Sequence, residues 1–479
     1  MFVRRGDLYC YLGLATQQER NWLQSYLTFK VSSFVRRRGR TKHVMKKVHL
    51  FEIDEDRFPA GLLPLVHKKA RQKGIQLRVI DGRSAALPKD PDADLGWLRD
   101  YQRGAVEAAL RRERGILRLP TGAGKTEILI GLMRALPGPW VFMAHRKDLM
   151  YQAAERFLLR LREHAEDPDA LDTVERLGGV HVGFCGDGKH DVLGPDGEAP
   201  QFICTTFQTL RRPNGPAIKN FARARGIVID ECHTLPADSH YKVAMRFERA
   251  RYRIGLSATP LQRGDKKSIY AISCLGPVIY SVKTEALIDR GVLAKPKIRM
   301  VPVEQDVAKP TWQGAYGAGV VRSTVRNKAI AQLAKIAKKP CLIFIKETKH
   351  GQLLTDRLQK EGLGAEFVYG RHSTGRRRAI VERLRHGDIE VGVCSVIFQE
   401  GIDIPELRSV IVACGGKSII GALQRIGRGM RKADGKDTFE VFDIFDRGNK
   451  WLEEHAKKRA KAYAKEGHTV VVEKGIPLL

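Results

Sequence analysis

A short glycine-rich stretch constrains the fold of this chain more than any other feature. Residues 120–126 read Pro-Thr-Gly-Ala-Gly-Lys-Thr, after the apolar run 115–119 and before a helix-like apolar pattern that starts at Ile128. A glycine-rich turn between a buried strand and a helix lets backbone N–H groups surround phosphate oxygens, with the positive helix end behind them. The stretch therefore predicts an α/β fold with a phosphate site.

The residue types in this loop suit a nucleoside triphosphate with Mg²⁺. Lys125 is expected to reach the outer phosphates, and the Thr126 hydroxyl to ligate the metal. The strict pattern has a further glycine where this chain has Leu119, so the loop alone leaves a plain strand–helix connection open. Four residues are expected to hold the phosphates with their backbone: Thr121, Gly122, Ala123 and Gly124.

Two adjacent carboxylates supply the second half of such a site. Asp230 and Glu231 follow the apolar run 226–229, and open α/β sheets bind ligands at the carboxyl ends of their strands. Asp230 is expected to hold the Mg²⁺, directly or through water. The alternative of two solvated acids in a loop explains neither the apolar run nor Ser-Ala-Thr-Pro at 257–260, after another strand-like run.

Charge and composition narrow the class of molecule that this chain could bind. The chain has 479 residues, enough for two to four domains, and its formal net charge of +30 indicates a polyanionic partner. No segment approaches the ~20 apolar residues of a membrane span, and the amino terminus lacks a signal-peptide core. The eight cysteines form no C-x-x-C pair, which argues against a zinc module or a disulfide framework. We expect a cytoplasmic protein in a bacterial or phage-infected cell, or a nuclear one in a eukaryote, with no membrane contact and no predictable protein partner.

The strand-like runs define the domains. Residues 1–88 predict a small basic α+β domain, with strands near 26–31 and 44–53 and a helix over 61–73. Strands alternating with helices predict two tandem parallel-sheet α/β domains, 94–290 and 291–450, followed by a basic helix and tail, 451–479. The expected strands of these two domains are 116–119, 140–144, 180–184, 202–205, 226–230, 252–256, 341–345, 365–369, 390–394, 408–413 and 438–443.

Some segments allow more than one interpretation. The basic run of the first domain fits a solvated hairpin tip, but the charge of the whole chain favours a phosphate-contacting loop. The tail helix is expected to pack on the second α/β domain, with DNA contact as a secondary role. Residues 262–330 show no clear pattern. The basic run comprises Arg36, Arg37, Arg38 and Arg40.

The motifs together resemble those of superfamily 2 helicases. They occur in the family's order over residues 94–445, and agreement of six spaced motifs is a specific signal. This resemblance implies two RecA-like domains with ATP between them. The front domain, with Phe-Glu-Ile-Asp at 51–54 and Phe-Pro-Ala-Gly-Leu at 58–62, is similar to that of bacteriophage UvsW-type helicases and more distantly to XPB-like repair helicases. The motifs are Leu98–Gln102, Pro120–Thr126, Asp230–His233, Ser257–Pro260, Gly401–Pro405 and Gln424–Arg431.

The resemblance also implies roles in ATP hydrolysis. Glu231 is expected to orient and deprotonate the attacking water, while Lys125 offsets phosphate charge. Arg428 and Arg431 correspond to the arginine fingers, and Gln102 to the residue that reads adenine, although a glutamine at a helix start is often solvated. Gly401 and Asp403 are expected to touch the nucleotide.

Further residues match the motifs that couple the nucleotide to nucleic acid. His233, Ser257, Thr259 and Gln424 correspond to coupling positions, although a buried core histidine is an alternative for His233. Gly264 departs from the Arg-Glu-Asp element of the XPB-like group, which places a damage-opening role in doubt. The expected nucleic-acid contacts outside the front domain are Arg146, Lys147, Thr206, Gln208 and Ser395.

The function implied is that of an ATP-dependent DNA helicase or translocase on branched DNA. It would remodel forks or Holliday junctions, or reanneal strands, in replication, recombination or repair. The alternatives are an XPB-like duplex translocase, an RNA helicase, and a nucleic-acid-binding protein with a silent ATPase. Translocation polarity, preferred junction, oligomeric state and phage or cellular origin do not follow from the sequence.

Overall fold

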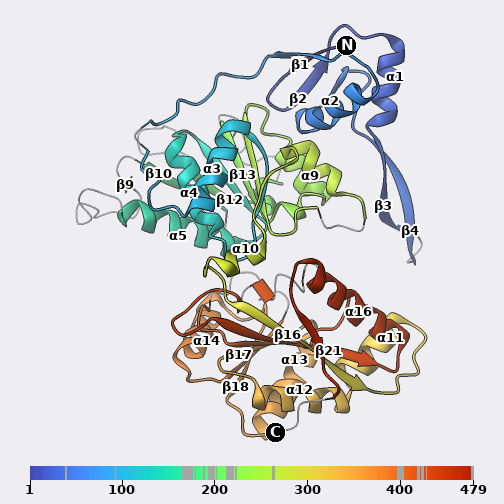
Figure 1. The fold of residues 1–479 in the computed structure, drawn as a ribbon, viewed down its shortest axis with the longest axis vertical. Coiled ribbons are helices and arrows are strands. Elements are labelled where there is room, and N and C mark those ends of the chain that lie inside the picture. Colours follow the sequence, from blue (N-terminus) through green and yellow to red (C-terminus); the bar gives the residue numbers. More distant parts are fainter. Residues whose placement is uncertain are drawn as a thin grey trace. The chain divides into compact units, whose positions relative to one another are not determined.

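The chain divides into two compact units, each described separately below (Figure 1). The first comprises residues 1–119 and 124–281, and the second 120–123 and 282–479. The computed structural model describes residues 1–37, 40–91, 93–163, 176–177, 180–186, 189–191, 200, 202–211, 221, 224–261, 265–395, 404–417, 421, 426–427 and 429–475.

The first unit begins with a small α+β domain. Its four-stranded sheet has the order β5-β2-β1-β6, in which only the β1–β6 pair is parallel. Helix α1 (Gln17–Tyr26) starts at Thr16, whose hydroxyl accepts the Glu19 N–H while the Glu19 carboxylate accepts the Thr16 N–H. Helix α2 (Leu63–Gln72) continues a 3₁₀ turn, η1 (Ala60–Leu62). The strands are β1 (Phe2–Arg5), β2 (Tyr9–Leu12), β5 (Arg57–Pro59) and β6 (Arg78–Asp81).

A separate two-stranded ribbon extends from this domain. Within the described part of the chain, strands β3 (Thr28–Arg37) and β4 (Arg40–His49) pair only with each other, antiparallel, from Thr28–His49 to Arg37–Arg40 (Figure 1). The predicted strands near 26–31 and 44–53 are thus present and paired, in a two-stranded sheet separate from the four-stranded one. The ribbon also contacts the parallel-sheet domain midway along β3, where the Ser32 N–H donates to the Asp265 carbonyl at 3.0 Å.

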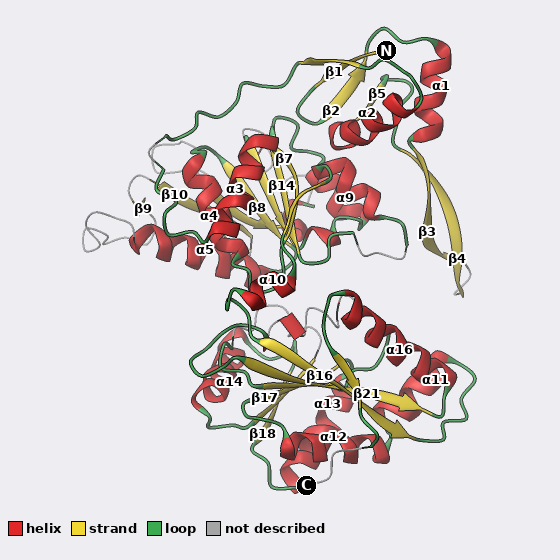
Figure 2. Cartoon of the chain, in the orientation of Figure 1, coloured by secondary structure: helices red, strands yellow, loops and turns green. Residues whose placement is uncertain are grey.

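A parallel sheet forms the rest of the first unit, and every predicted strand of this domain is present. Helices flank the sheet (Figure 2), and β9 (Arg176–Leu177) and β11 (Lys189–Asp191) add antiparallel pairs to β10. In sheet order the parallel strands are β10 (Val180–Gly186), β12 (Phe202–Thr206), β8 (Trp140–Ala144), β13 (Gly226–Asp230), β14 (Tyr252–Ser257), β7 (Arg114–Arg118) and β15 (Val278–Ser281). The helices are α3 (Asp100–Arg112), α4 (Lys125–Ala135), α5 (Lys147–Glu163), α6 (Phe207–Leu210), α8 (Asp238–Ala244) and α9 (Ser268–Leu275).

Helix α9 joins the small domain to the parallel sheet. Ile269 is buried in the core of the small domain, with Ile272 packed against it. Gly61 lies so close to this helix that a Cβ atom there would come within 3 Å of the carbonyl oxygens of Ile272 and Ser273. Arg114 of β7 also donates to the Asp7 carbonyl at 2.7 Å. The small domain is therefore packed onto the parallel-sheet domain rather than tethered to it.

The second unit contains another parallel sheet, as predicted, with one long strand that the sequence did not reveal. Strand β16 pairs with β21 along its whole length, from Lys295–Thr438 to Glu304–Arg447. In sheet order the strands are β18 (Ala365–Val368), β19 (Val391–Ser395), β17 (Cys341–Ile345), β20 (Ser409–Val412), β21 (Thr438–Arg447), β16 (Lys295–Glu304) and β22 (Val470–Val472). The helices are α10 (Thr284–Asp289), α11 (Trp312–Tyr316), α12 (Thr324–Ile336), α13 (Thr348–Lys360), α14 (Thr374–His386) and α16 (Lys450–Lys465).

The tail helix α16 packs on this second sheet, as the sequence indicated. Tyr463 is fully buried and donates its hydroxyl to the Asp443 carboxylate of β21 at 2.7 Å.

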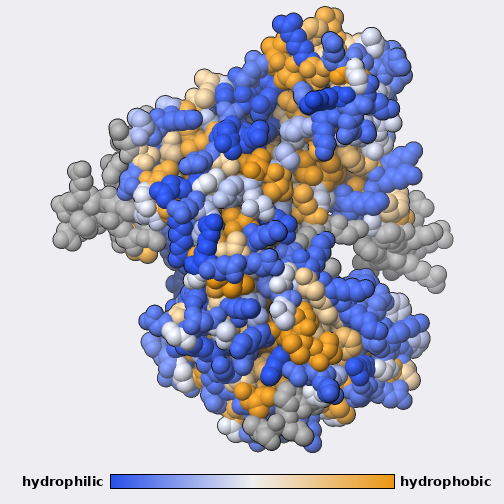
Figure 3. All heavy atoms as spheres, in the orientation of Figure 1, coloured by the Kyte–Doolittle hydropathy of each residue, from blue (hydrophilic) through white to orange (hydrophobic). Residues whose placement is uncertain are grey.

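Hydrophilic residues cover most of the face drawn in Figure 3, with smaller apolar patches between them. Within the described residues, no helix combines the length and the apolar character needed to cross a bilayer.

Candidate functional site

The glycine-rich loop leads into helix α4 through a glycine N-cap. The Leu119 N–H donates to the Ser257 carbonyl at 3.0 Å, which fixes the end of β7 beside β14. Gly122 and Gly124 have φ of +85° and +74°, a left-handed backbone that glycine adopts without strain. Gly124 is the N-cap of α4 and offers no side chain to the helix, so its first N–H groups are free of a side-chain cap. Leu119 itself is fully buried, which explains why a hydrophobic residue stands where the strict pattern has glycine.

Lys125 and Glu231 form an ion pair beside this loop. Lys125 Nζ lies 3.1 Å from Glu231 Oε1, and both side chains are largely buried. Burial acts to lower the pKa of Lys125, but the charges of Glu231 and Asp230 outweigh it and raise the pKa overall. Burial acts to raise the pKa of Glu231, but the Lys125 charge and the hydrogen bond from His233 hold that pKa well below its usual range. The pair therefore stays charged at neutral pH.

Asp230 and Glu231 are held in different environments although they are adjacent. Asp230 ends β13, and its Oδ1 accepts the Glu231 N–H at 2.9 Å. Glu231 has φ +46°, an unusual conformation for a residue other than glycine. Burial and the neighbouring Glu231 charge raise the pKa of Asp230. A divalent cation would offset this crowded negative charge, so the two oxygen-bearing side chains suit a hard metal such as Mg²⁺.

A hydrogen-bonded chain connects Glu231 to the predicted coupling residues. His233 Nδ1 lies 3.1 Å from Glu231 Oε2 and 3.2 Å from Ser257 Oγ. Ser257 Oγ donates to Glu231 Oε2 at 3.3 Å and accepts the Thr259 N–H at 3.2 Å. The Thr259 hydroxyl is buried and has no partner among the described residues. The structure thus brings Lys125, Glu231, His233, Ser257 and Thr259 into one connected group.

Gln102 is buried beside the glycine-rich loop and is not a solvated residue. It is 4% exposed, and its Oε1 accepts the Arg99 N–H at 3.0 Å at the start of α3. A Cβ atom at Gly124 would lie within 3 Å of Gln102 Nε2, so the amide is next to the glycine backbone. The adenine-reading role stays a prediction, because this geometry alone does not test it.

The nucleic-acid residues predicted in the parallel-sheet domain lie at neighbouring strand ends. Gln208 Nε2 donates to the His145 carbonyl at 2.9 Å, which connects the ends of β12 and β8. Arg146 is half-buried and Lys147 exposed at the start of α5. The Thr206 hydroxyl instead caps α6, since it accepts the Thr209 N–H at 3.2 Å.

In the second unit, the structure describes some of the predicted site residues and not others. Ser395 is described. It lies at the end of β19 and is 2% exposed, and its hydroxyl lacks a partner within the described part of the chain. Arg431 is described too, and its backbone forms an isolated β-bridge with Leu293. The residues or side chains not described are those of Arg36, Arg37, Arg38, Arg40, Gly264, Gly401, Asp403, Gln424 and Arg428.

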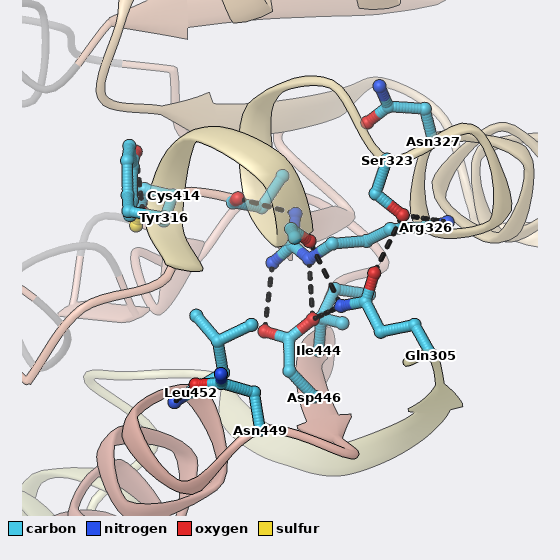
Figure 4. Close-up of polar contacts among 12 residues, drawn as sticks. Gln305, Tyr316, Ser323, Arg326, Asn327, Cys414, Ile444, Asp446, Asn449 and Leu452 are labelled. Atoms are coloured by element: carbon cyan, nitrogen blue, oxygen red, sulfur yellow. Dashed lines mark hydrogen bonds and ion pairs between the residues drawn. The ribbon is translucent and has the colours of Figure 1, made fainter. Parts of the chain in front are cut away.

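Two buried ion pairs of the second unit were not predicted from the sequence. Arg326 Nε donates to Asp446 Oδ1 at 2.7 Å (Figure 4), and Arg459 Nη2 donates to Asp443 Oδ1 at 2.8 Å. All four side chains are at most 2% exposed. A signal existed in β21, because Asp443 and Asp446 stand among the apolar residues of this strand and buried aspartates require partners.

Two family models match the chain. The model described as "Type III restriction enzyme, res subunit" matches residues 96–262, and "Helicase conserved C-terminal domain" matches residues 325–433. The first covers the glycine-rich loop, the paired acids and the Ser-Ala-Thr-Pro motif at 257–260. The second covers the segment that ends with Arg431.

Individual proteins agree with these models. A putative DNA 3'-5' helicase Rad25 from Halobacterium salinarum is 27% identical over 77% of this chain and 57% of its own length. The ATP-dependent DNA helicase uvsW of Enterobacteria phage T4 is 28% identical over 72% of this chain and 68% of its own. Among solved structures, the DNA-bound Type ISP restriction-modification enzyme LlaBIII has a TM-score of 0.58 at 16% identity, over 86% of this chain and 34% of that one.

These matches cover only part of the relatives' length, so they support the family of this chain more strongly than its function. The chain spans 57% and 51% of the lengths of two archaeal Rad25 relatives, so their activities as whole proteins do not transfer directly. The motif order, the two parallel sheets and the two family models nevertheless agree over the same residues. The chain belongs to the superfamily 2 helicases.

Proposed function

We propose that this protein is an ATP-dependent DNA helicase or translocase that remodels branched DNA. The observation that carries the proposal is the connected group from Lys125 through Glu231 to Ser257 and Thr259. It joins a phosphate-binding lysine and a candidate base to the motif that follows β14. Relatives named as DNA helicases support DNA as the track.

Lys125 and Glu231 change partners when ATP binds. The lysine leaves the carboxylate for the outer phosphates, where its charge offsets the charge that develops in phosphoryl transfer. Glu231 then loses the main charge that holds its pKa low. Its pKa rises and it becomes a better base for the attacking water. ATP binding thus prepares its own hydrolysis, while His233 and Ser257 keep the carboxylate oriented.

The Mg²⁺ that accompanies ATP would be held by Thr126 and Asp230. When bound, it would neutralise phosphate charge. Asp230 suits this role because burial and Glu231 already disfavour its lone negative charge. Arg428 and Arg431 are proposed as the arginine fingers. Such a residue is worth ~10³–10⁵ in rate, so hydrolysis would depend on the second unit.

Nucleic acid is proposed to bind mainly through its backbone. The net charge of +30 fits a polyanion. Exposed Lys147 and Gln208 lie at adjacent strand ends, and Arg36, Arg37 and Arg40 belong to the ribbon formed by β3 and β4. Hydroxyls, lysines and the backbone amides at strand ends suit phosphates, so binding would be independent of sequence and steeply salt-dependent. Preference for branched DNA rests on the uvsW relative alone.

The rate of ATP hydrolysis with different nucleic acids tests this proposal. We expect a synthetic DNA fork to stimulate the parent protein strongly, linear duplex less and structured RNA least. Lys125→Ala should hydrolyse ATP at background under every condition. Equal rates in the parent and in Lys125→Ala would identify a binding protein without ATPase activity. Strong stimulation by RNA but not by the fork would replace DNA with RNA as the track.

A further inference from the structure

The loop formed by residues 413–416 has an unusual backbone and a sensitive position. It follows β20 and precedes the 424–431 segment that contains the proposed arginine fingers. Gly415 and Gly416 have φ of +57° and +80°, so the chain leaves the extended conformation of the strand. Its carbonyl groups therefore need partners other than a neighbouring strand.

Three side chains from three helices supply those partners. Arg326 of α12 donates from Nη1 to the Ala413 carbonyl at 2.9 Å. Tyr316 of α11 donates its hydroxyl to the Cys414 carbonyl at 3.1 Å (Figure 4). Arg459 of α16 donates from Nη1 to the Gly416 carbonyl at 2.6 Å. The loop is thus attached at three points along four residues.

Both arginines are themselves fixed by aspartates on β21. Arg326 contacts Asp446, while Arg459 donates two parallel hydrogen bonds to Asp443, from Nε to Oδ2 at 2.9 Å and from Nη2 to Oδ1 at 2.8 Å. Such bidentate pairs fix the orientation of the guanidinium plane. The remaining N–H groups therefore point in a defined direction, towards the loop.

Stability alone does not account for these pairs. Burying an arginine and an aspartate carries a desolvation penalty that their attraction often only offsets, and apolar replacements of similar size are frequently as stable. Two such pairs on one strand, each with a spare donor on the same loop, indicate a positioning role.

We propose that Tyr316, Arg326 and Arg459 are positioning residues that hold loop 413–416 in one conformation, and that ATP hydrolysis depends on this conformation because the loop leads in sequence to the proposed arginine fingers. This inference rests on the proposed ATPase function. It makes α16 a working part of the motor, although this helix begins at Lys450, beyond the family match that ends at residue 433. Loss of an anchor lowers kcat for ATP hydrolysis and leaves the ATP KM nearly unchanged, because Lys125 and its loop are untouched.

A triple variant removes the Arg459 anchor with side chains of similar size and leaves neither a buried Asp443 carboxylate nor a Tyr463 hydroxyl without its partner. It combines Arg459→Met, Asp443→Leu and Tyr463→Phe, since Tyr463 donates to Asp443. We expect a parental melting temperature, a kcat lower by about tenfold to a hundredfold, and a KM within twofold. Amide hydrogen exchange in a peptide spanning residues 413–417 should be faster. The matched control removes an exposed pair on the same helix, Glu454→Ala with Lys458→Ala, and should change none of these values.

Each result decides the inference. A folded triple variant with parental kcat and parental exchange would overturn it. If the triple variant does not fold, Tyr316→Phe decides, with an expected two- to threefold lower kcat and faster exchange near Cys414, and parental values would overturn the inference. If the parent protein fails to hydrolyse ATP, the proposed function fails. Unchanged amide hydrogen exchange in the variants would separately reject the inference that Tyr316, Arg326 and Arg459 hold loop 413–416.

Discussion

Lys125 Nζ lies 3.1 Å from Glu231 Oε1, so the lysine of the glycine-rich loop is paired with the candidate base rather than exposed to solvent. The two groups hold each other charged within a mostly buried site. In the proposed mechanism, a triphosphate competes with Glu231 for Lys125, and the carboxylate that the lysine leaves is free to act as the base. The ion pair would then connect nucleotide binding to the chemistry of hydrolysis.

Replacing the base should separate these two steps. In Glu231→Gln the lysine loses its charged partner, so ATP affinity is expected to rise, while the rate of hydrolysis falls by about 10²–10⁴ because general-base catalysis is lost. Equilibrium binding of a fluorescent ATP analogue and single-turnover hydrolysis measure the two quantities. The exposed Asp238→Asn serves as the control and should resemble the parent. Hydrolysis by Glu231→Gln within a few-fold of the parent would show that another group activates the water.

The second unit should lose stability in mild acid through His350. This histidine is fully buried, and its Nε2 lies 3.0 Å from Asn327 Oδ1. Burial, together with the charge of Arg326, lowers the pKa of His350 to about 3. The unfolded chain, with a pKa near 6.5, binds the proton first, so stability is present above pH ~6.5 and is lost as the pH falls towards 3.

The difference between the folded and unfolded pKa of His350 lowers the free energy of unfolding by about 2 kcal/mol at pH 5. Denaturant unfolding of the parent and of His350→Gln, which keeps a donor for Asn327, measures it. The parent should lose about that much more stability than the variant between pH 7.5 and pH 5. Identical slopes for the two proteins would mean that His350 is protonated in the folded state.

The contact between the small domain and helix α9 should be sensitive to a single methyl group. Gly61→Ala places a Cβ within 3 Å of backbone carbonyl oxygens, which cannot move as a side chain can. We expect the first unit to lose about 1–3 kcal/mol of stability, the usual effect of overpacking. Thermal unfolding checks this value. Gly375→Ala in α14 is the control, because nothing lies within 4 Å of its added Cβ, and it should be neutral or slightly stabilising. A stable Gly61→Ala protein would show that the small domain can shift on α9.

Local patterns predicted most of the fold, and the exceptions have physical causes. Buried parallel strands form apolar runs of a few residues, which is why runs such as 226–230 were recognised. Strand β16 was missed because it contains Pro296 and Pro302, and proline normally argues against a strand paired on both sides. Alternation predicts the two strands of the ribbon β3–β4, but it does not show that they stand apart from the four-stranded sheet.

The site divides in the same way. Lys125, Asp230 and Glu231 stand in motifs whose spacing carries the chemistry, so the sequence could single them out. Arg459 and Asp443 are 16 positions apart, and Arg326 and Asp446 are separated by 120. No local pattern names such partners, because they meet only through the order of strands in the sheet. The contacts of Arg326 and Arg459 with loop 413–416 could therefore be found only in the structure.

The most direct measurement is strand exchange on a synthetic four-way junction with one labelled arm. With ATP and Mg²⁺, the parent protein is predicted to convert the junction into two duplexes at a rate that falls steeply with salt. Lys125→Ala should bind the junction with parental affinity and leave it intact. Conversion by Lys125→Ala at the parental rate, or ATP hydrolysis by the parent without any change in the junction, would contradict the account of an ATP-driven motor on branched DNA.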